Sequence, residues 1–81
     1  MDMRALVGTN VRYWRQKLGL TQEAFSEKSG LTQQYISDLE RGRRNPTVVT
    51  LFELATALGI KPLDLLRPGR RRAAGKGWPA R

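Results

Sequence analysis

Apolar residues recur at helical intervals near the start of the chain. They are separated by four, three and four residues, and the positions are Val7, Val11, Trp14 and Leu18. This spacing places them on one face of an amphipathic helix. Asp2 precedes the stripe as a suitable N-cap, and Gly19 follows it as a residue that readily ends a helix. The pattern therefore predicts a first helix between these two residues.

Two short helices are predicted next, over residues 21–28 and from Thr32 to about Arg41. Thr21 and Thr32 are N-cap candidates, because a threonine hydroxyl can accept a hydrogen bond from the first turn of a helix. Gly30 separates the two helices, and glycine tolerates the positive φ that a sharp turn requires. The residues expected to face the core are Ala24, Phe25, Ile36 and Leu39.

A fourth helix is predicted between Thr47 as its N-cap and Gly59 as its end. Its inward stripe consists of Val48, Leu51, Leu54, Ala55 and Leu58. Pro62 suits the first turn of a fifth short helix over residues 62–66. No segment alternates apolar and polar residues as a strand would. The sequence thus predicts an all-α domain of five short helices over residues 1–66.

The net charge of +8 is unevenly distributed along the chain. Nine of the 15 basic residues lie in residues 1–66 together with all seven acidic residues, so that this part is nearly neutral. The other six basic residues lie in residues 67–81, which contain no acidic residue. A segment rich in Arg, Gly and Pro is typical of a flexible tail. Such a tail either serves only solubility or adds contacts to phosphates, and both interpretations stand at this point.

The residue types present weigh against several function classes. The chain has no cysteine and no histidine, so common metal ligands and the usual general base are missing. No run of apolar residues approaches the length of a membrane span, and the first residues do not resemble a secretory signal. We therefore expect a non-enzymatic protein of the cytoplasm, with no metal, no other cofactor and no membrane partner.

The two short helices and the glycine turn between them, residues 21–41, have the layout of a helix-turn-helix motif. In that motif the second helix enters the major groove of DNA, and its first residues meet base edges. Gln33 and Gln34 each present a donor beside an acceptor, which suits the edge of an adenine. Ser37 shares their outward face, since successive residues turn by about 100° on a helix. Alone, this pattern is weak, because polar residues on a short helix are usually only solvated.

Six short runs of residues, spread over most of the chain, match a known family at the same spacing. They are Leu20-Thr21-Gln22-Glu23, Gly30-Leu31-Thr32, Tyr35-Ile36-Ser37, Leu39-Glu40-Arg41-Gly42, Asn45-Pro46-Thr47 and Ala57-Leu58-Gly59. With these runs in order, the chain from about Val7 to Leu66 resembles the phage-repressor and Cro family of helix-turn-helix proteins, also called Xre-type. The resemblance implies a compact, five-helix, lambda-repressor-like fold. It also implies a sequence-specific DNA-binding transcriptional regulator.

The resemblance further implies which residues contact double-stranded DNA. The positions that match the base-reading surface are Thr32, Gln33, Gln34, Ser37 and Asp38. The positions that match contacts with phosphates are Thr21, Gln22, Tyr35, Arg41, Arg43, Arg44 and Asn45. Tyr35 has two interpretations: it contacts a phosphate or a thymine methyl group, or it is buried between the two helices. Asp38 is acidic, so it repels phosphates and can accept a hydrogen bond from cytosine N4.

Arg15 and Glu40 match a pair that in this family often forms a partly buried salt bridge between the first helix and the third. The alternative is two unrelated surface charges. Two positions depart from the family pattern, namely Ser26 where alanine is usual and Ser29 where an apolar residue is common. The Ser26 hydroxyl needs a hydrogen-bond partner, and we expect looser packing beside Ser29.

Proteins of this family commonly bind as homodimers, since two half-sites about one helical turn apart add their contacts. The expected partners are therefore a short palindromic operator and a second copy of the chain, and no small-molecule effector is evident. The leucines of the fifth helix either bind the second copy or close the core of the monomer. They are Leu63, Leu65 and Leu66.

Close variants of this function are the controller protein of a restriction-modification system and the antitoxin of a small toxin, encoded by a bacterium or a phage. A rival of a different class binds RNA or membrane surfaces through residues 67–81. That rival predicts binding that survives changes at Gln33 and Gln34 and follows anionic charge alone.

Overall fold

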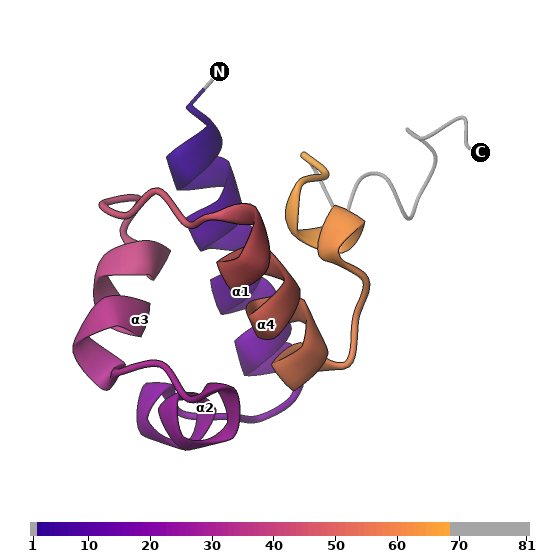
Figure 1. Cartoon of the computed structure of the whole chain (residues 1–81). Coiled ribbons are helices and arrows are strands. Elements are labelled where there is room, and N and C mark those ends of the chain that lie inside the picture. The colour runs from indigo at the N-terminus through magenta and orange to yellow at the C-terminus, as the bar shows by residue number, and fades with distance from the viewer. Residues whose placement is uncertain (1, 69–81) are drawn as a thin grey trace.

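The structure, a computed structural model, describes residues 2–68 of the chain. In that range it contains four α-helices, one 3-10 helix and no strand (Figure 1). The elements are α1 (Met3–Lys17), α2 (Gln22–Ser29), α3 (Gln33–Glu40), α4 (Val48–Leu58) and η1 (Pro62–Leu65). None of the described helices is long and apolar enough to cross a membrane. The all-α class predicted from the sequence is confirmed.

The fifth element, η1, lies where a fifth short helix was predicted over residues 62–66. It is a short 3-10 helix, with backbone hydrogen bonds from Asp64 N to Lys61 O and from Leu66 N to Leu63 O, both 2.9 Å long. Bonds of this i to i+3 type are common in helical pieces of only a few residues. A short helix is thus present where it was predicted, and it ends at Leu65, one residue before the predicted end.

Side-chain caps determine where the four α-helices begin. Asp2 Oδ1 accepts hydrogen bonds from the N–H groups of Arg4 and Ala5 at the start of α1. At the other three helices a threonine hydroxyl accepts from the N–H group three residues later, at 3.0 Å each; these residues are Thr21, Thr32 and Thr47. The bonds satisfy donors that a helix leaves unpaired in its first turn. All four predicted N-caps are confirmed.

The core lies where the inner faces of the four α-helices meet η1. Its buried side chains are Val7, Val11, Phe25, Ile36, Leu39, Leu54, Ala55, Ala57, Leu58 and Leu65. Trp14 and Leu51 are partly buried against this core, and Ala24 is partly buried. The core prediction was wrong at Leu18 and Val48, which are exposed, Val48 by 81%. Leu18 follows the last residue of α1, and Val48 lies in the first turn of α4, where the helix extends past the core.

A glycine of α1 allows α1 and α3 to approach each other closely. A Cβ atom added at Gly8 would lie 2.2 Å from the carbonyl oxygen of Leu39. No side chain fits at that distance, so the two helix backbones can meet here only because residue 8 is glycine. No local pattern in the sequence signals this role of Gly8.

A buried asparagine joins η1 to α1. Asn10 is almost fully buried, and its Nδ2 donates hydrogen bonds to the carbonyl oxygens of Leu65 at 2.8 Å and Arg67 at 2.9 Å. These bonds satisfy a buried polar side chain and two carbonyl groups of an irregular segment. They hold the chain against α1 as far as residue 67, one residue beyond the predicted end of the domain.

Candidate nucleic-acid interface

Helices α2 and α3 form the predicted helix-turn-helix unit on the side of the molecule away from η1 (Figure 1). Gly30 ends α2 in the left-handed region, with φ of 82°, and so allows the sharp turn. The Ser26 hydroxyl donates to the Leu31 carbonyl, and the Ser29 hydroxyl accepts from the Leu31 N–H at 3.2 Å. Both serines therefore hold the turn through hydrogen bonds. The expected partner of Ser26 is found within the motif itself.

Helix α3 divides into an inner and an outer face. Ile36 and Leu39 are completely buried against the other helices. The outer face carries all five predicted base-reading residues, and none of them is buried: Thr32, Gln33 and Gln34 are exposed, while Ser37 and Asp38 are partly buried. The first turn of α3 thus presents hydroxyl and amide groups to the solvent from a helix whose opposite side is fixed in the core. Contacts of these residues with bases stay a prediction.

Four side chains of the outer face contact one another. Gln34 Nε2 donates to Asp38 Oδ1 at 3.1 Å, and the other carboxylate oxygen of Asp38 lies 3.6 Å from Arg44 Nη2. The Arg44 guanidinium also lies over the ring of Tyr35, with Cζ 5.1 Å from the ring centroid. We call these four residues, Gln34, Tyr35, Asp38 and Arg44, the outer cluster. Only the Gln34–Asp38 contact has a signal in the sequence, the i, i+4 spacing of an amide and a carboxylate.

Tyr35 is partly buried, as one of its two interpretations expected. Its side chain packs against the core. Burial raises the pKa of its phenol above the ordinary value, and the nearby charge of Arg44 opposes part of that shift. The same ring carries the Arg44 guanidinium on one face. Tyr35 therefore supports a basic side chain at the edge of α3, and its contact with a phosphate or a thymine methyl stays a prediction.

The loop that follows α3 carries the predicted phosphate-binding residues. The exposed members are Arg41, Arg43, Arg44 and Asn45. The carbonyl oxygen of Asp38 accepts hydrogen bonds from the N–H groups of Arg41 at 3.1 Å and Arg43 at 2.9 Å, which folds the loop back toward α3. Gly42 adopts φ of 77° and passes close to Ala5 of α1. The loop therefore starts beside the outer face with its arginine side chains accessible.

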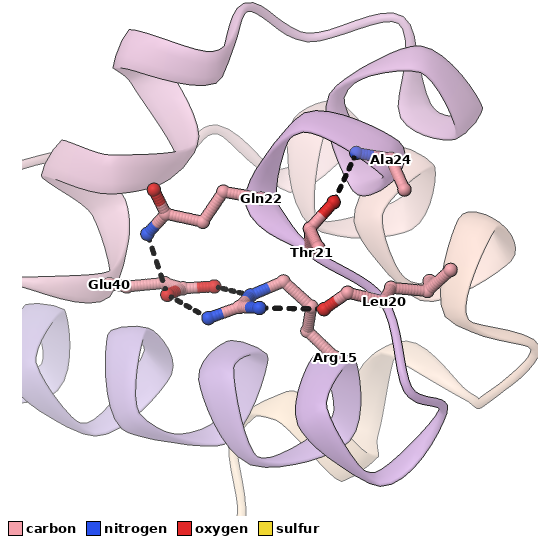
Figure 2. A network of polar contacts seen from close by, with 6 residues as sticks. All are labelled: Arg15, Leu20, Thr21, Gln22, Ala24 and Glu40. Carbon is pink, nitrogen blue, oxygen red and sulfur yellow. Dashed lines mark hydrogen bonds and ion pairs between the residues drawn. The ribbon is translucent and has the colours of Figure 1, made fainter.

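The inner end of α3 carries the predicted ion pair with α1 (Figure 2). Arg15 Nε and Nη2 donate to the two carboxylate oxygens of Glu40 at 2.6 and 3.0 Å. Arg15 Nη1 donates to the Leu20 carbonyl at 2.7 Å, between α1 and α2. The pair joins α1 to α3 as predicted, and it also fixes the segment that leads into α2. Two unrelated surface charges, the alternative interpretation, do not describe it.

Gln22 belongs to the same network. Its Nε2 donates to Glu40 Oε1 at 3.1 Å, and its amide oxygen points away from that carboxylate (Figure 2). Thr21, beside it, uses its hydroxyl to cap α2 through the Ala24 N–H group. The start of α2 is thereby held against the end of α3. The phosphate contacts expected of Thr21 and Gln22 stay predictions.

The leucines of the last element do not form the surface that the dimer prediction required. Leu65 is completely buried in the core, and Leu66 is partly buried against it. Only Leu63 is exposed, by 57%. Leu65 therefore follows the second alternative: it closes the core of the monomer and is not available to a second copy. Other exposed apolar side chains lie on α4, at Val48, Val49 and Phe52.

The predicted basic tail begins at residue 67, and from residue 69 it lies outside the described residues. Within the described part, Arg67 Nη1 lies 3.7 Å from Asp64 Oδ1. Asn10 binds the carbonyl oxygen of Arg67, as described above. The first residue of the predicted tail is thus attached to the domain.

Comparison with known proteins identifies the family of the chain. The helix-turn-helix family HTH_3 matches residues 11–66. The chain is 59% identical over 68 residues to an uncharacterized HTH-type transcriptional regulator, y4dJ, of Sinorhizobium fredii, covering 84% of this chain and 88% of that protein. These sequence matches include both helices of the motif.

Solved structures agree with that family. The crystal structure of the hypothetical transcription factor NHTF from Neisseria has a TM-score of 0.83 and 34% identity, covering 90% of this chain and 84% of that chain. The tetramer of the restriction-modification controller protein C.Esp1396I, in complex with its natural 35 base-pair operator, has a TM-score of 0.73 and 29% identity, covering 80% of this chain and 86% of that one. The chain therefore belongs to the helix-turn-helix family of DNA-binding transcriptional regulators.

Proposed function

We propose that α3 is the reading helix of this regulator and lies in the major groove of its operator. The observation that carries the proposal is the first turn of α3, where Thr32, Gln33 and Gln34 are exposed while Ile36 and Leu39 fix the opposite side in the core. Glutamine can pair in bidentate fashion with adenine. A helix fixed in this way presents its polar groups to bases in one orientation, which favours specific pairing.

The residues around α3 position the protein along the DNA through contacts with backbone phosphates. Thr21 and Gln22 lie at the start of α2, and the exposed loop after α3 carries Arg41, Arg43, Arg44 and Asn45. Gln22 bonds Glu40 at the end of α3, and the loop begins at the next residue, so both groups lie beside the proposed reading helix. Contacts with phosphates position a protein on DNA without discriminating between sequences. Binding should therefore combine a few base contacts with a moderate dependence on salt.

We also propose that the regulator binds a palindromic operator as a homodimer. A solved relative, the controller protein C.Esp1396I, forms a tetramer on its operator. In this chain the exposed apolar side chains that a second copy can cover lie on η1 and α4, at Leu63, Val49 and Phe52. Sedimentation equilibrium of the full chain tests the dimer, with Leu63→Glu and Phe52→Glu as variants. A monomer at high concentration argues against it.

The similarity to a restriction-modification controller protein supports one narrower role. The chain aligns with 86% of the length of the controller protein C.Esp1396I, so a restriction-modification controller is a second candidate function. Either role requires DNA binding and no catalysis. Either role also places the protein where the DNA is, in the cytoplasm of a bacterium. Fragments of the source genome that bind the protein can be recovered and sequenced. A bound site directly before restriction-modification genes would favour the narrower role.

Selection from a randomised duplex library tests the reading helix. The unaltered protein should select a palindromic site with half-sites about one helical turn apart. Gln33→Ala should lower the affinity for that site by about 1 to 3 kcal/mol and relax the preference at one base position. Arg43→Ala should weaken binding to all sequences alike. Gln16→Ala, which removes an exposed glutamine of α1, is the matched control and should leave the selected site unchanged. An unchanged preference for Gln33→Ala would show that the register assigned to α3 is wrong.

A further inference from the structure

One carboxylate holds two of the side chains that are expected to contact DNA. Asp38 Oδ1 accepts from Gln34 Nε2 at 3.1 Å, and Asp38 Oδ2 lies 3.6 Å from Arg44 Nη2. Gln34 is a candidate base reader and Arg44 a candidate phosphate ligand. Both oxygens of Asp38 are thus engaged in the protein without DNA. A DNA contact that takes Gln34 Nε2 or Arg44 Nη2 away from Asp38 would therefore change the surroundings of this carboxylate.

The contact between Asp38 and Arg44 is one that DNA can exchange. The nitrogen–oxygen distance of 3.6 Å is long, and 48% of the Arg44 side chain is exposed. An exposed ion pair of this kind has little net stability. The ring of Tyr35 lies under the guanidinium, so Arg44 can keep this cation–π contact when it leaves the carboxylate. Separation of Arg44 from Asp38 should therefore cost little free energy, which leaves the guanidinium available to a phosphate.

We propose that Asp38 is a specificity-determining residue that releases Arg44 only on a matching site. On a duplex with no donor opposite Asp38, the carboxylate keeps Arg44 and the protein loses one phosphate contact. On the operator, a base-edge donor, cytosine N4, pairs with the carboxylate and Arg44 turns to a phosphate. This inference rests on the proposed position of α3 in the major groove.

The charge of Asp38 explains why the exchange discriminates between sequences. A carboxylate brought among phosphates without a donor raises the free energy of the complex. If Arg44 leaves Asp38 on a wrong site, the carboxylate loses its only cationic neighbour among the described side chains. If Arg44 stays, the phosphate contact is lost. Either way the complex with a wrong sequence is weakened, whereas the matching base avoids both penalties.

Asp38→Asn tests the proposal with little change of shape. The amide oxygen can still accept from Gln34, but the charge that holds Arg44 is gone. Affinity for a random-sequence duplex should rise, by up to about tenfold at 0.1 M salt, because one more arginine is available to phosphates. The slope of log K against log salt on that duplex should steepen by about 0.9. The ratio of operator to random-duplex affinity should fall, and the preference for cytosine at one position should be lost.

Asp64→Asn is the matched control. Asp64 also lies near an arginine, with Oδ1 3.7 Å from Arg67 Nη1, and the exposed fraction of its side chain equals that of Asp38. The variant changes the net charge equally but lies on η1, outside the proposed interface. Its effect on affinity should be similar for operator and random duplex. If Asp38→Asn behaves like Asp64→Asn in both ratio and slope, the proposal is overturned.

A second pair of variants locates the effect at Arg44. In an Arg44→Gln background, Asp38→Asn should no longer steepen the salt slope on random duplex, since the exchanged cation is absent. A steepening that persists would assign the effect to net charge and overturn the exchange. The Gln33→Ala selection separates this proposal from the one on which it rests. If Gln33→Ala changes the selected site and Asp38→Asn does not, only the proposal for Asp38 is overturned. If neither variant changes the selected site, the proposal that α3 lies in the major groove is overturned as well.

Discussion

Helix α3 carries two acidic residues that each lie near an arginine, and the two pairs differ in almost every respect. Glu40 is paired with Arg15 through two hydrogen bonds of 2.6 and 3.0 Å, and only 4% of its side chain is exposed. Asp38 lies 3.6 Å from Arg44, and 20% of its side chain is exposed. The acids are two residues apart, so they point about 200° apart around the helix. One faces α1 and the other faces the proposed DNA surface.

The difference separates a structural pair from an exchangeable one. Glu40 also accepts from Gln22, and Arg15 also binds the Leu20 carbonyl, so the inner network holds α1, α2 and α3 together. Removal of one partner there leaves an uncompensated charge in a nearly dry site. The outer pair is accessible to water and ions, which screen it. The same two functional groups therefore contribute to folding on one face and are available for recognition on the other.

The largest expected effect is at the inner pair. Glu40→Ala should lower the free energy of unfolding by about 3 to 5 kcal/mol, because Arg15 remains buried without its partner. Urea denaturation followed by circular dichroism measures this loss. The double variant Arg15→Met and Glu40→Leu replaces both charges with apolar side chains and should recover most of it. If the double variant is less stable than Glu40→Ala, the loss does not come from an unpaired charge.

A smaller loss is expected where α1 and α3 meet at Gly8. Gly8→Ala should lower the free energy of unfolding by about 1 to 3 kcal/mol, since the new methyl group requires the helices to move apart. The inner pair lies between the same two helices, so their displacement should also weaken it. Thr9→Ala, at the next and exposed position of α1, is the control and should change stability by less than about 0.5 kcal/mol. Equal losses for both variants would mean that the close approach is not maintained in solution.

Much of the inner architecture was predictable, because it follows from local rules. Threonine and aspartate N-caps, the glycine at the turn and the apolar stripes depend on neighbours in sequence, and the four α-helices begin where these signals place them. The Arg15–Glu40 pair was predictable for a different reason. It joins residues 25 positions apart, and only the family resemblance related them.

The remaining features depend on distant parts of the chain. The buried role of Asn10 arises from carbonyl groups more than 50 residues later, and nothing near Asn10 signals them. Leu63 and Leu65 lie two residues apart in a leucine-rich segment, yet one is exposed and the other closes the core. Residues two apart point to different sides of a short helix, so which leucine turns inward depends on how η1 packs against α1 and α4. The contacts of Arg44 depend on a loop whose path a periodic pattern does not describe.

The outer cluster also predicts a dependence on alkaline pH. Burial raises the pKa of Tyr35 in the folded protein above its ordinary value near 10, so above that pH the unfolded chain loses the proton first. The contribution to stability is therefore fully present below about pH 10 and is lost as the pH rises from there through the raised pKa of the folded state. Tyr35→Phe should make the alkaline loss of stability less steep than in the parent protein, as measured by melting curves over a series of pH values. Equal steepness for Tyr35→Phe and the parent protein would contradict this assignment.

The smallest expected change in stability is at Asp38, and it is the most informative for the comparison of the two acids. Asp38→Asn should lower the free energy of unfolding by no more than about 1 kcal/mol, because an exposed pair at 3.6 Å contributes little to folding. Glu40→Gln makes the same chemical change two residues away and should lower it much more, since Arg15 then faces a neutral amide in a buried site. Urea denaturation of both variants gives the two values under one condition. If Asp38→Asn is as damaging as Glu40→Gln, Asp38 is structural, and a change in its DNA preference would reflect a disturbed α3 rather than the release of Arg44.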